Sequence, residues 1–370
     1  MPSEYVERHA WGVELRSIRA NRPKRAQTGA RAQTFGAALE QAEQLWRASE
    51  TVGTIASPLL LFYGLTQAGR AICAAGTPGQ AWRSAESHGL AFQFTRPASG
   101  ANLDLAAVVV KPHGDGLIQY VARVLDSEVL SGPATLSALL GSLDAKLLFS
   151  ESQVPDPKPL EVHQMWITPA PAATYATKSL FLAPAPDRFA ANTELVPAGP
   201  HNLEHTRIIP PPGEEIAEWL EAYPTLRGLG VPTQVIGPEP AGGRFGRDDW
   251  IIKLVWDAGA PMADVKQSDW TLEHLDEPYS YDWNGTHGVV LPAVAGNTQA
   301  HDLVIAWWLV LYCLSMLARY YPKEWTEMLD VDRSPLAVPI EHFISVAYST
   351  VPALIAFRLR LLRATQEDRV

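Results

Sequence analysis

The segment DLVIAWWLVLYCLSMLARYYPKEW, Asp302–Trp325, decides how the rest of the chain is interpreted. Its uncharged run, Leu303–Ala318, has 16 residues. As a helix this run reaches roughly 24 Å, whereas the hydrocarbon core of a bilayer is roughly 30 Å thick. Arg319 follows directly, Pro322 then ends the helix, and we expect no second apolar run of spanning length. The sequence therefore predicts a buried core helix and no membrane partner.

Composition indicates a globular protein with one large core or two ordinary ones. The 370 residues are 47% hydrophobic and 19% charged, which excludes global disorder, and the net charge of −10 argues against a surface devoted to nucleic acid throughout. Cys73 and Cys313 lie in apolar stretches, and buried free thiols are typical of a reducing cytosol. The N-terminal residues MPSEYVERHAWG contain no apolar segment typical of a secretory signal. We therefore expect a cytoplasmic protein.

The first quarter of the chain has the signals of two helices. Thr34 can cap a helix that ends before Gly53. Ser57 and Pro58 are suited to the N-cap and first position of a second helix, which ends near Gly76. This second helix is apolar on almost every side, so we expect it to be buried.

The middle of the chain has the signals of strands and loops. Five runs are rich in β-branched and aromatic residues, namely NLDLAAVVVK, GLIQYVARVLD, LEVHQMWIT, TQVIG and DWIIKLVWD. The residues KPHGDG between the first two predict a hairpin turn. Prolines are dense from Glu151 to Pro240 and predict long ordered loops, with one short helix at GEEIAEWLEAY.

The last quarter is predicted to be helical again. After the helix at 302–321 comes VPIEHFISVAYSTVPALIAFRLRLLRAT, in which Pro352 predicts a kink or a restart. The simplest fold class is α+β, in which N- and C-terminal helices pack together and a Pro-rich β section is inserted between them. The expected sections are a basic N-terminal arm at 1–33, an N-terminal helical part at 34–95, the β and loop section at 96–295, and a C-terminal helical part at 296–370.

The motif HNLEH, His201 to His205, fits the pattern H-x-x-E-H of helical zinc sites, in which Glu204 would be the general base. Its surroundings argue against that interpretation, because Pro200 precedes it and TRIIPPP follows it. A zinc hydrolase is therefore the least favoured alternative, and we predict no metal ion.

Two other motifs carry little weight. Arg83 and His88 form R-x4-H, a spacing of helical ribonucleases, but chance alone produces such matches in a chain with many arginines and histidines. The glycine-rich loop AGGRFGRDDW, Ala241–Trp250, leads into a predicted strand rather than a helix, so a turn is the better interpretation. No cofactor fingerprint is present, and we predict no cofactor.

A basic arm is the clearest charge feature. Residues 16–31 hold six basic residues and no acid, which gives this segment +6 and leaves −16 on the rest of a chain whose total is −10. Such an arm can contact phosphates or dock onto the acidic face of its own protein, and the sequence leaves both alternatives open. Its candidate ligand-binding residues are Arg19, Arg22, Lys24 and Arg25.

Polar residues within the apolar helices are further candidates. Helical spacing places Tyr63, Gln67 and Arg70 on one face, and Ser315 lies four residues before Arg319. A charged group in apolar surroundings needs a partner, so these faces are expected to converge on an internal polar site with Glu341 or His342. The alternative is a buried ion pair that fixes the register of the helices.

Three stretches together resemble one known family. They are PLLLFYGLTQAGRA (Pro58–Ala71), HGL (His88–Leu90) and LSMLARYYPKEW (Leu314–Trp325), and the chain is similar in them to the YaaC-like family of bacterial proteins. The resemblance covers the helical ends and implies a soluble cytoplasmic bacterial protein, without assigning a reaction. It directs attention away from HNLEH and to Tyr63, Arg70, His88, Arg319 and Trp325.

The leading hypothesis is a cytosolic protein that binds a phosphate-bearing ligand, with RNA, DNA or a nucleotide as the favoured partner. If the protein is a nuclease-like effector, His88 is the general acid or base, and Arg70 and Arg319 stabilise the anion. A second hypothesis is a non-catalytic scaffold protein, in which some of the twelve tryptophans form the interface of a homo-oligomer.

Overall fold

In the computed structural model, the described residues are 10–83, 87–97, 103–143, 157–165, 175–183, 185–190, 193–196, 205–240, 250–261 and 287–367. The chain forms two compact units. The helical unit comprises Met1–Pro155, Val294–Asn297 and His301–Val370, and the sheet unit comprises Asp156–Ala293 and Thr298–Ala300. The predicted α+β class, with helices from both ends of the chain packed together and a β section inserted, is therefore confirmed.

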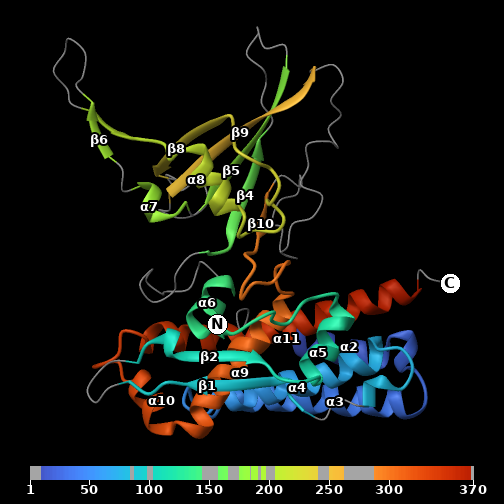
Figure 1. Ribbon diagram of the computed structural model, residues 1–370. Coiled ribbons are helices and arrows are strands. Elements are labelled where there is room, and N and C mark those ends of the chain that lie inside the picture. Colours follow the sequence, from blue (N-terminus) through green and yellow to red (C-terminus); the bar gives the residue numbers. More distant parts are fainter. Residues whose placement is uncertain are drawn as a thin grey trace. The chain divides into compact units, whose positions relative to one another are not determined.

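The helical unit takes its helices from both ends of the chain (Figure 1). Its N-terminal elements are α2 (Ala10–Ala20), η1 (Lys24–Ala26), α3 (Gly29–Ser49), α4 (Ser57–Gly76), η2 (Ala81–Arg83), β1 (Leu90–Phe94), η3 (Leu105–Ala107), β2 (Val108–Pro112), α5 (Leu117–Leu125), β3 (Ala134–Thr135) and α6 (Leu136–Leu143). Its C-terminal elements are α9 (Leu303–Tyr320), α10 (Pro322–Met328) and α11 (Ala337–Glu367).

Helix α9 is the core of this unit. All its residues from Leu303 to Ser315 are buried, and the Asp302 carboxylate caps its first turn by accepting a 2.8 Å hydrogen bond from the backbone N–H of Val304. Against α4, the packing depends on Gly69, where an added Cβ would lie 2.5 Å from the Trp308 ring. The prediction of a buried helix from the short uncharged run agrees with this placement.

Two helices of the described part, α9 and α11, are long and apolar enough to span a membrane by length and composition. The expectations that the run at 303–318 is too short to span and that no second run of spanning length exists do not hold by this criterion, because both α9 and α11 meet it. In the structure, 78% of the apolar part of α9 and 50% of that of α11 are buried within the protein. Core helices meet the same criterion, so the two helices are weak evidence for a membrane.

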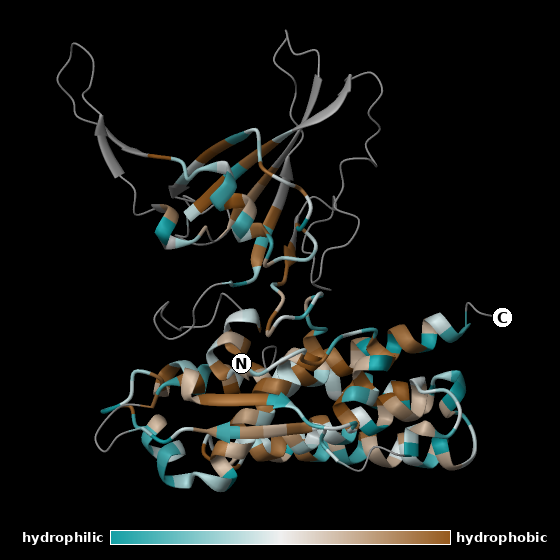
Figure 2. Ribbon diagram, viewed as in Figure 1, coloured by the Kyte–Doolittle hydropathy of each residue, from teal (hydrophilic) through white to brown (hydrophobic). Residues whose placement is uncertain are grey.

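A small antiparallel sheet in the order β1-β2-β3 packs on α9. The buried Tyr312 hydroxyl donates a 3.2 Å hydrogen bond to the Leu90 carbonyl, and its ring lies 6.5 Å from that of Phe92. Strand β2 is hydrophobic along most of its length, as Figure 2 shows. Through these contacts, Tyr312 holds strand β1, and the loop that precedes it, against α9.

The predicted strand GLIQYVARVLD was wrong, because these residues form α5. Its buried residues Leu117, Ile118, Val121 and Ala122 recur at helical spacing. The segment KPHGDG consequently joins strand β2 to helix α5 and is not a turn between two strands. The strand was predicted from the content of β-branched residues, whereas the spacing of the apolar residues indicates a helix.

Two details of the predicted helices also differ. Helix α3 begins at Gly29, earlier than the predicted cap at Thr34. Ser57 does not act as an N-cap, because its hydroxyl donates to the carbonyls of Ser49 and Gly53 and thereby fastens the start of α4 to the end of α3.

Helix α11 runs without a restart through Pro352. Of the two alternatives predicted there, a kink or a restart, the restart was wrong: Pro352 is buried, and packing of the surrounding turns retains the helix despite the missing backbone donor. A further link holds α11 in place, because the Arg358 guanidinium lies 2.5 Å from the Asp302 carboxylate, and the two side chains are 18% and 6% exposed.

The sheet unit has an antiparallel sheet in the order β10-β4-β5-β9-β8. Its elements are β4 (Leu160–Met165), β5 (Tyr175–Ala183), α7 (Asp187–Ala190), β6 (Thr193–Val196), β7 (His205–Ile208), α8 (Gly213–Leu220), β8 (Gln234–Pro240), β9 (Trp250–Pro261) and β10 (His287–Val290). Ile216 and Trp219 of α8 pack in one core with Leu180 and Leu254 of the sheet. The strands predicted at LEVHQMWIT, TQVIG and DWIIKLVWD and the helix at GEEIAEWLEAY are confirmed.

Candidate functional site

One face of α4 presents polar side chains to solvent. Tyr63 and Arg70 are exposed and Gln67 is half-buried, as the predicted helical spacing requires. Close packing beside this face holds α4 in its orientation, because an added Cβ at Gly64 would lie 2.4 Å from the Trp46 indole nitrogen. The rotation of α4 is therefore set by its glycines, and its polar face is left outside.

Helix α9 leaves the core at its C-terminal end and brings Arg319 to this face. Arg319 is exposed, and its guanidinium donates a 3.2 Å hydrogen bond to the Tyr63 hydroxyl. It also lies over the ring of Tyr320 at 4.9 Å from the centroid. The position of Arg319 is thus set by side chains from both helices.

His88 lies in the short loop before β1, and backbone hydrogen bonds fix that loop. The carbonyl of Ser87 accepts a 2.8 Å hydrogen bond from Leu117, and the carbonyl of Gly89 accepts one of 2.7 Å from the Gln119 side chain. Gly89 has φ +78°, and a Cβ there would collide with Gln119, so this corner requires glycine. The HGL motif therefore has a structural reason for its glycine.

The His88 ring rests on aromatic side chains of the core. Its centroid lies 5.3 Å from Phe62 and 6.2 Å from Tyr312, while the rest of the residue is exposed. Burial of this side of the ring lowers the pKa of His88, and the positive charges of Arg70 and Arg319 lower it further. His88 is therefore largely neutral at pH 7.

We name Tyr63, Arg70, His88 and Arg319 the His88 cluster. Neither Arg70 nor Arg319 forms an ion pair with a carboxylate among the described residues. Two exposed guanidinium groups thus act electrostatically on the His88 imidazole, and neither is paired with a carboxylate in the part of the chain that the structure describes. Such a site favours an anion, because a bound negative charge relieves the repulsion between the cations.

The internal polar site that was expected does not form. Ser315 is buried, but its hydroxyl donates to the Tyr312 carbonyl one turn earlier within α9. Glu341 and His342 are exposed on α11. Arg319 lies at the end of α9, where the helix has left the core, so it does not need a buried partner. Trp325 is buried and donates a 2.9 Å hydrogen bond to the Ile55 carbonyl, which makes it a structural residue.

The basic arm is docked onto its own unit, which was one of the two alternatives. Arg19 pairs with Glu40, and Arg22 donates to the carbonyls of Arg19 and Ala32 at 2.9 Å. Arg25 donates at 2.6 Å to the Gly76 carbonyl at the end of α4. Three of the four candidate residues of the arm thus have partners within the protein, and Lys24 is exposed without an ion pair in the described part.

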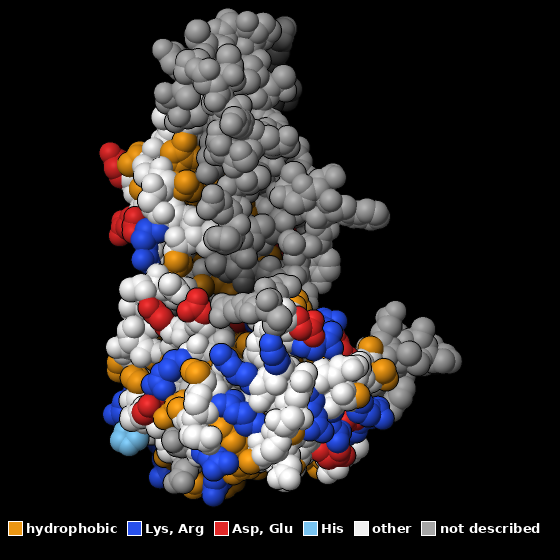
Figure 3. Space-filling view, turned by 90° about the vertical axis from the view of Figure 1, so that its right-hand side faces the viewer, with side chains coloured by type: hydrophobic (Ala, Val, Ile, Leu, Met, Phe, Trp, Pro, Cys, Tyr) orange, Lys and Arg blue, Asp and Glu red, His pale blue; other side chains and the backbone are white. Residues whose placement is uncertain are grey.

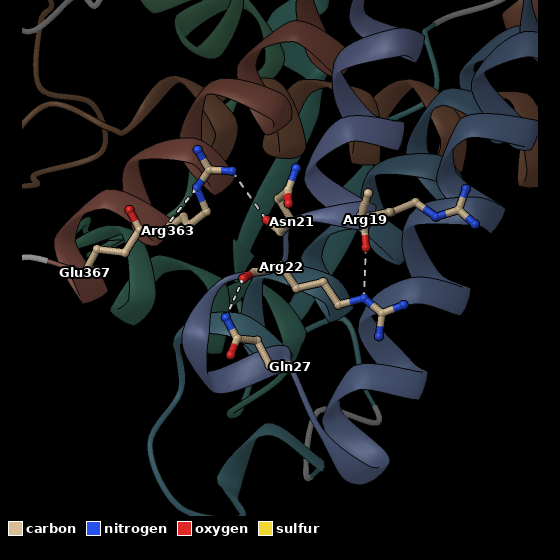
Figure 4. A pocket seen from close by; sticks show the side chains of 7 residues that line it. Arg19, Asn21, Arg22, Gln27, Arg363 and Glu367 are labelled. Carbon is tan, nitrogen blue, oxygen red and sulfur yellow. Dashed lines mark hydrogen bonds and ion pairs between the residues drawn. The ribbon is translucent and has the colours of Figure 1, made fainter.

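Two pockets adjoin the docked arm. The first, of about 710 Å³, lies between Arg19, Arg22 and the end of α11, where Arg363 donates to the Asn21 carbonyl at 3.5 Å and faces Glu367 (Figure 4). The second, of about 900 Å³, lies between η1, the end of α4, α5 and the last turns of α11, and we name it the α4–α11 pocket. Figure 3 shows Lys and Arg gathered on this side of the helical unit, with Asp and Glu among them.

Other chemistries find no support in the described residues. No group of three or more His, Cys, Asp or Glu able to hold a metal ion occurs there. Of HNLEH, residues 201–204 lie outside the described part, and His205 is the first residue of strand β7. Both cysteines are free and buried, and burial raises the pKa of Cys73 to about 12, so this thiol stays protonated.

The R-x4-H spacing does not lie on one helix. Arg83 ends the short η2 turn, where its guanidinium lies over the Trp82 ring, and His88 lies in the loop before β1. The loop AGGRFGRDDW lies outside the described residues up to Trp250, where β9 begins. The tryptophans that could supply an oligomer interface are mostly core residues: those described and buried are Trp11, Trp46, Trp219, Trp256, Trp307, Trp308 and Trp325.

The charged residues of the His88 cluster could be predicted from the sequence. The aromatic rings on which His88 packs, and the α4–α11 pocket, could not. Phe62 and Tyr312 were not considered because apolar positions within helices are ordinarily core. The pocket residues Tyr120 and Arg123 were assigned to a strand, although the helical period of α5 was available as a signal.

The fold and this site define an α+β protein with an exposed cationic cluster at the junction of α4, α9 and the loop before β1, whose arginines pair with no carboxylate among the described residues. The sequence profile of the family described as YaaC-like Protein matches residues 7–179 and 238–359, and the chain belongs to this family. The matched ranges contain every member of the His88 cluster and leave out HNLEH. No curated protein and no solved structure matches the chain.

Proposed function

We propose that this chain is a cytosolic protein that binds a phosphate-bearing ligand at the His88 cluster, with RNA or DNA as the favoured ligand. The observation that carries the proposal is the pair of exposed arginines beside His88, neither of which has a carboxylate partner in the described part of the chain. Guanidinium groups bind phosphate oxygens through paired N–H donors. The two buried, free cysteines support the cytosolic setting, because reduced thiols persist there.

The rest of the molecule supports a local site rather than a wholly basic surface. The net charge is −10, and most arginines of the arm are held by carbonyls or carboxylates of their own unit. Exposed rings beside the cations, such as that of Tyr63, offer faces on which an unpaired base can stack. A single strand therefore fits the cluster better than a duplex, whose bases are already stacked.

The test is a binding assay with labelled single- and double-stranded RNA and DNA at two salt concentrations. We expect salt-sensitive binding, with single strands preferred. Arg70→Gln and Arg319→Gln should each weaken binding about tenfold or more, because a hydrogen bond to a charged group contributes about 1.5–3 kcal/mol. Lys323→Gln is the control, since Lys323 is an exposed cation on α10 and pairs only loosely with Glu327 at 3.9 Å. Equal affinity in the arginine variants and the control would contradict the proposal.

Cleavage of RNA is a second candidate function, favoured by the neutral state of His88. A neutral imidazole can take the proton of a ribose 2′-hydroxyl as that oxygen bonds to phosphorus and the bond to the 5′-oxygen breaks, while water supplies the proton of the leaving group. The two arginines would stabilise the extra negative charge on the phosphorus centre. Denaturing gels of the same samples test this: shortened RNA strands should form with the wild type and disappear with His88→Ala. DNA, which lacks the 2′-hydroxyl, should remain intact.

A further inference from the structure

Four cations are among the residues that line the α4–α11 pocket. They are Lys24 and Arg25 of η1, Arg123 of α5 and Arg358 of α11, and Asp126 is the one carboxylate among the lining residues. Arg123 and Arg358 are paired with Asp115 at 2.6 Å and Asp302 at 2.5 Å, outside the lining. Lys24 has no such partner in the described part, and Arg25 bonds to a carbonyl, which leaves its charge in place. The excess positive charge therefore lies at η1.

The pocket lining also includes apolar side chains and an aromatic ring. Leu361 of α11 is 46% exposed, unlike the core positions of the same helix, and Val124 and Leu362 are half-buried beside it. The Arg123 guanidinium lies over the Tyr120 ring at 4.9 Å from the centroid. A flat heterocycle can pack against such an apolar wall and stack on a guanidinium plane.

The pocket is built by side chains that join distant parts of the chain. Gln366 donates a 2.9 Å hydrogen bond to the Ala75 carbonyl of α4, and its side-chain oxygen accepts one of 3.2 Å from the backbone N–H of Arg25. Arg31 closes the same corner by donating at 2.8 Å to the carbonyls of Ala74 and Thr77. The volume of about 900 Å³ lies within the range of sites for small organic ligands.

We propose that the α4–α11 pocket binds a nucleoside monophosphate, with its phosphate at Lys24 and Arg25 and its base against Leu361 and Arg123. This site is separate from the His88 cluster and shares none of its residues, so it extends the proposed function and does not depend on it. The expected ligands also differ, because the pocket is proposed to take a single nucleotide and the cluster a strand of nucleic acid.

The test is titration calorimetry of the full chain with the four common ribonucleoside monophosphates, with ribose 5-phosphate and with the free nucleosides. At least one monophosphate should bind tenfold or more tightly than ribose 5-phosphate and than its own nucleoside. Ribose 5-phosphate binding as tightly as the best monophosphate would overturn the assignment of a base site, and no binding by any monophosphate would overturn the proposal.

Variants locate the ligand and separate the two proposals. Lys24→Gln should weaken binding of the monophosphate tenfold or more, and Leu361→Asn severalfold, while Lys323→Gln should leave it unchanged. Lys24 is exposed and forms no ion pair within the described ranges, so its substitution should not threaten folding. If Arg70→Gln and Arg319→Gln abolish monophosphate binding and Lys24→Gln does not, the ligand occupies the His88 cluster and the pocket proposal is overturned.

Discussion

His88 shows how the charge state of one residue follows from its neighbours. Its ring lies on Phe62 and Tyr312, and two arginines act on it, so the pKa lies below the ordinary value of 6.5. Both causes disfavour the imidazolium ion. A bound anion acts in the opposite direction, because it favours the protonated ring.

The affinity for a phosphodiester strand should therefore depend on pH. Since the bound anion raises the pKa of His88, binding takes up a proton between the lowered pKa of the free protein and the higher pKa of the complex. Affinity should accordingly fall as the pH rises through this window, by up to about tenfold for each unit by which the pKa is raised. An oligonucleotide without a terminal phosphate is the suitable ligand, because its diester charge is constant over this range. Fluorescence anisotropy at fixed ionic strength measures the effect.

Two variants control this experiment. His88→Gln should bind with little dependence on pH, whereas His342→Gln, which removes an exposed histidine of α11, should behave as the wild type. A wild-type affinity that is constant from pH 5.5 to pH 7.5 would show that His88 does not sense the ligand.

At the scale of single elements, Gly69 determines how closely α4 approaches α9. Gly69→Ala places a methyl group against the Trp308 ring within the core, and overpacking of this kind costs about 1–3 kcal/mol. The free energy of unfolding, measured with urea, should fall accordingly. Gly36→Ala is the matched control in α3, because its Cβ meets only the Arg22 guanidinium, with the nearest nitrogen at 3.3 Å. There the gain in helix propensity should leave stability equal or raise it by roughly 0.5–1 kcal/mol.

The link between α9 and α11 supplies a second prediction at this scale. Asp302→Asn retains an N-cap for α9 but leaves Arg358 without its carboxylate, and breaking a buried pair in this way costs about 3–5 kcal/mol. Glu14→Gln removes the partner of the more exposed Arg360 and should cost less than about 1 kcal/mol. Similar losses of stability in the two variants, measured by urea unfolding, would show that the Asp302 pair is not buried in solution.

Many of the helices and strands could be predicted from local sequence signals, and the wrong predictions have physical causes. Helices α4 and α9 were predicted because long apolar segments end at Gly76 and Pro322. Helix α5 was missed because three β-branched residues and a tyrosine in a short segment resemble a strand, although the spacing of the buried residues is helical. Pro352 could not be judged locally, since only packing around α11 decides whether a helix continues through proline.

At the scale of the whole molecule, the two units have separate cores, so each is expected to unfold with its own free energy. Trp219 belongs to the core of the sheet unit, and Trp219→Ala should cost that unit about 3–5 kcal/mol. The His88 cluster lies in the helical unit, so oligonucleotide binding at room temperature should be unchanged. Calorimetry should show the transition of the sheet unit at a lower temperature while that of the helical unit stays in place. A single transition that shifts as a whole would indicate that the units unfold together.

The candidate site could be predicted only in part because its members come from distant segments. Tyr63 and Arg70 share a helical face, which spacing reveals, but the meeting of Arg319 with Tyr63 depends on how α9 crosses α4. The resemblance to the YaaC-like family indicated these residues because its motifs contain them, and the chain belongs to that family. The α4–α11 pocket depends on the packing of both ends of the chain, which no local pattern encodes.

The most direct test of the central claim is the pKa of His88, measured by two-dimensional NMR in the wild type and in Arg70→Gln and Arg319→Gln. In the free wild type the pKa should lie below 6.5, and it should rise in each variant because one repelling charge is removed. Addition of the oligonucleotide should raise the wild-type pKa further. An ordinary pKa that neither variant nor ligand changes would contradict the account, because the arginines would then not act on His88.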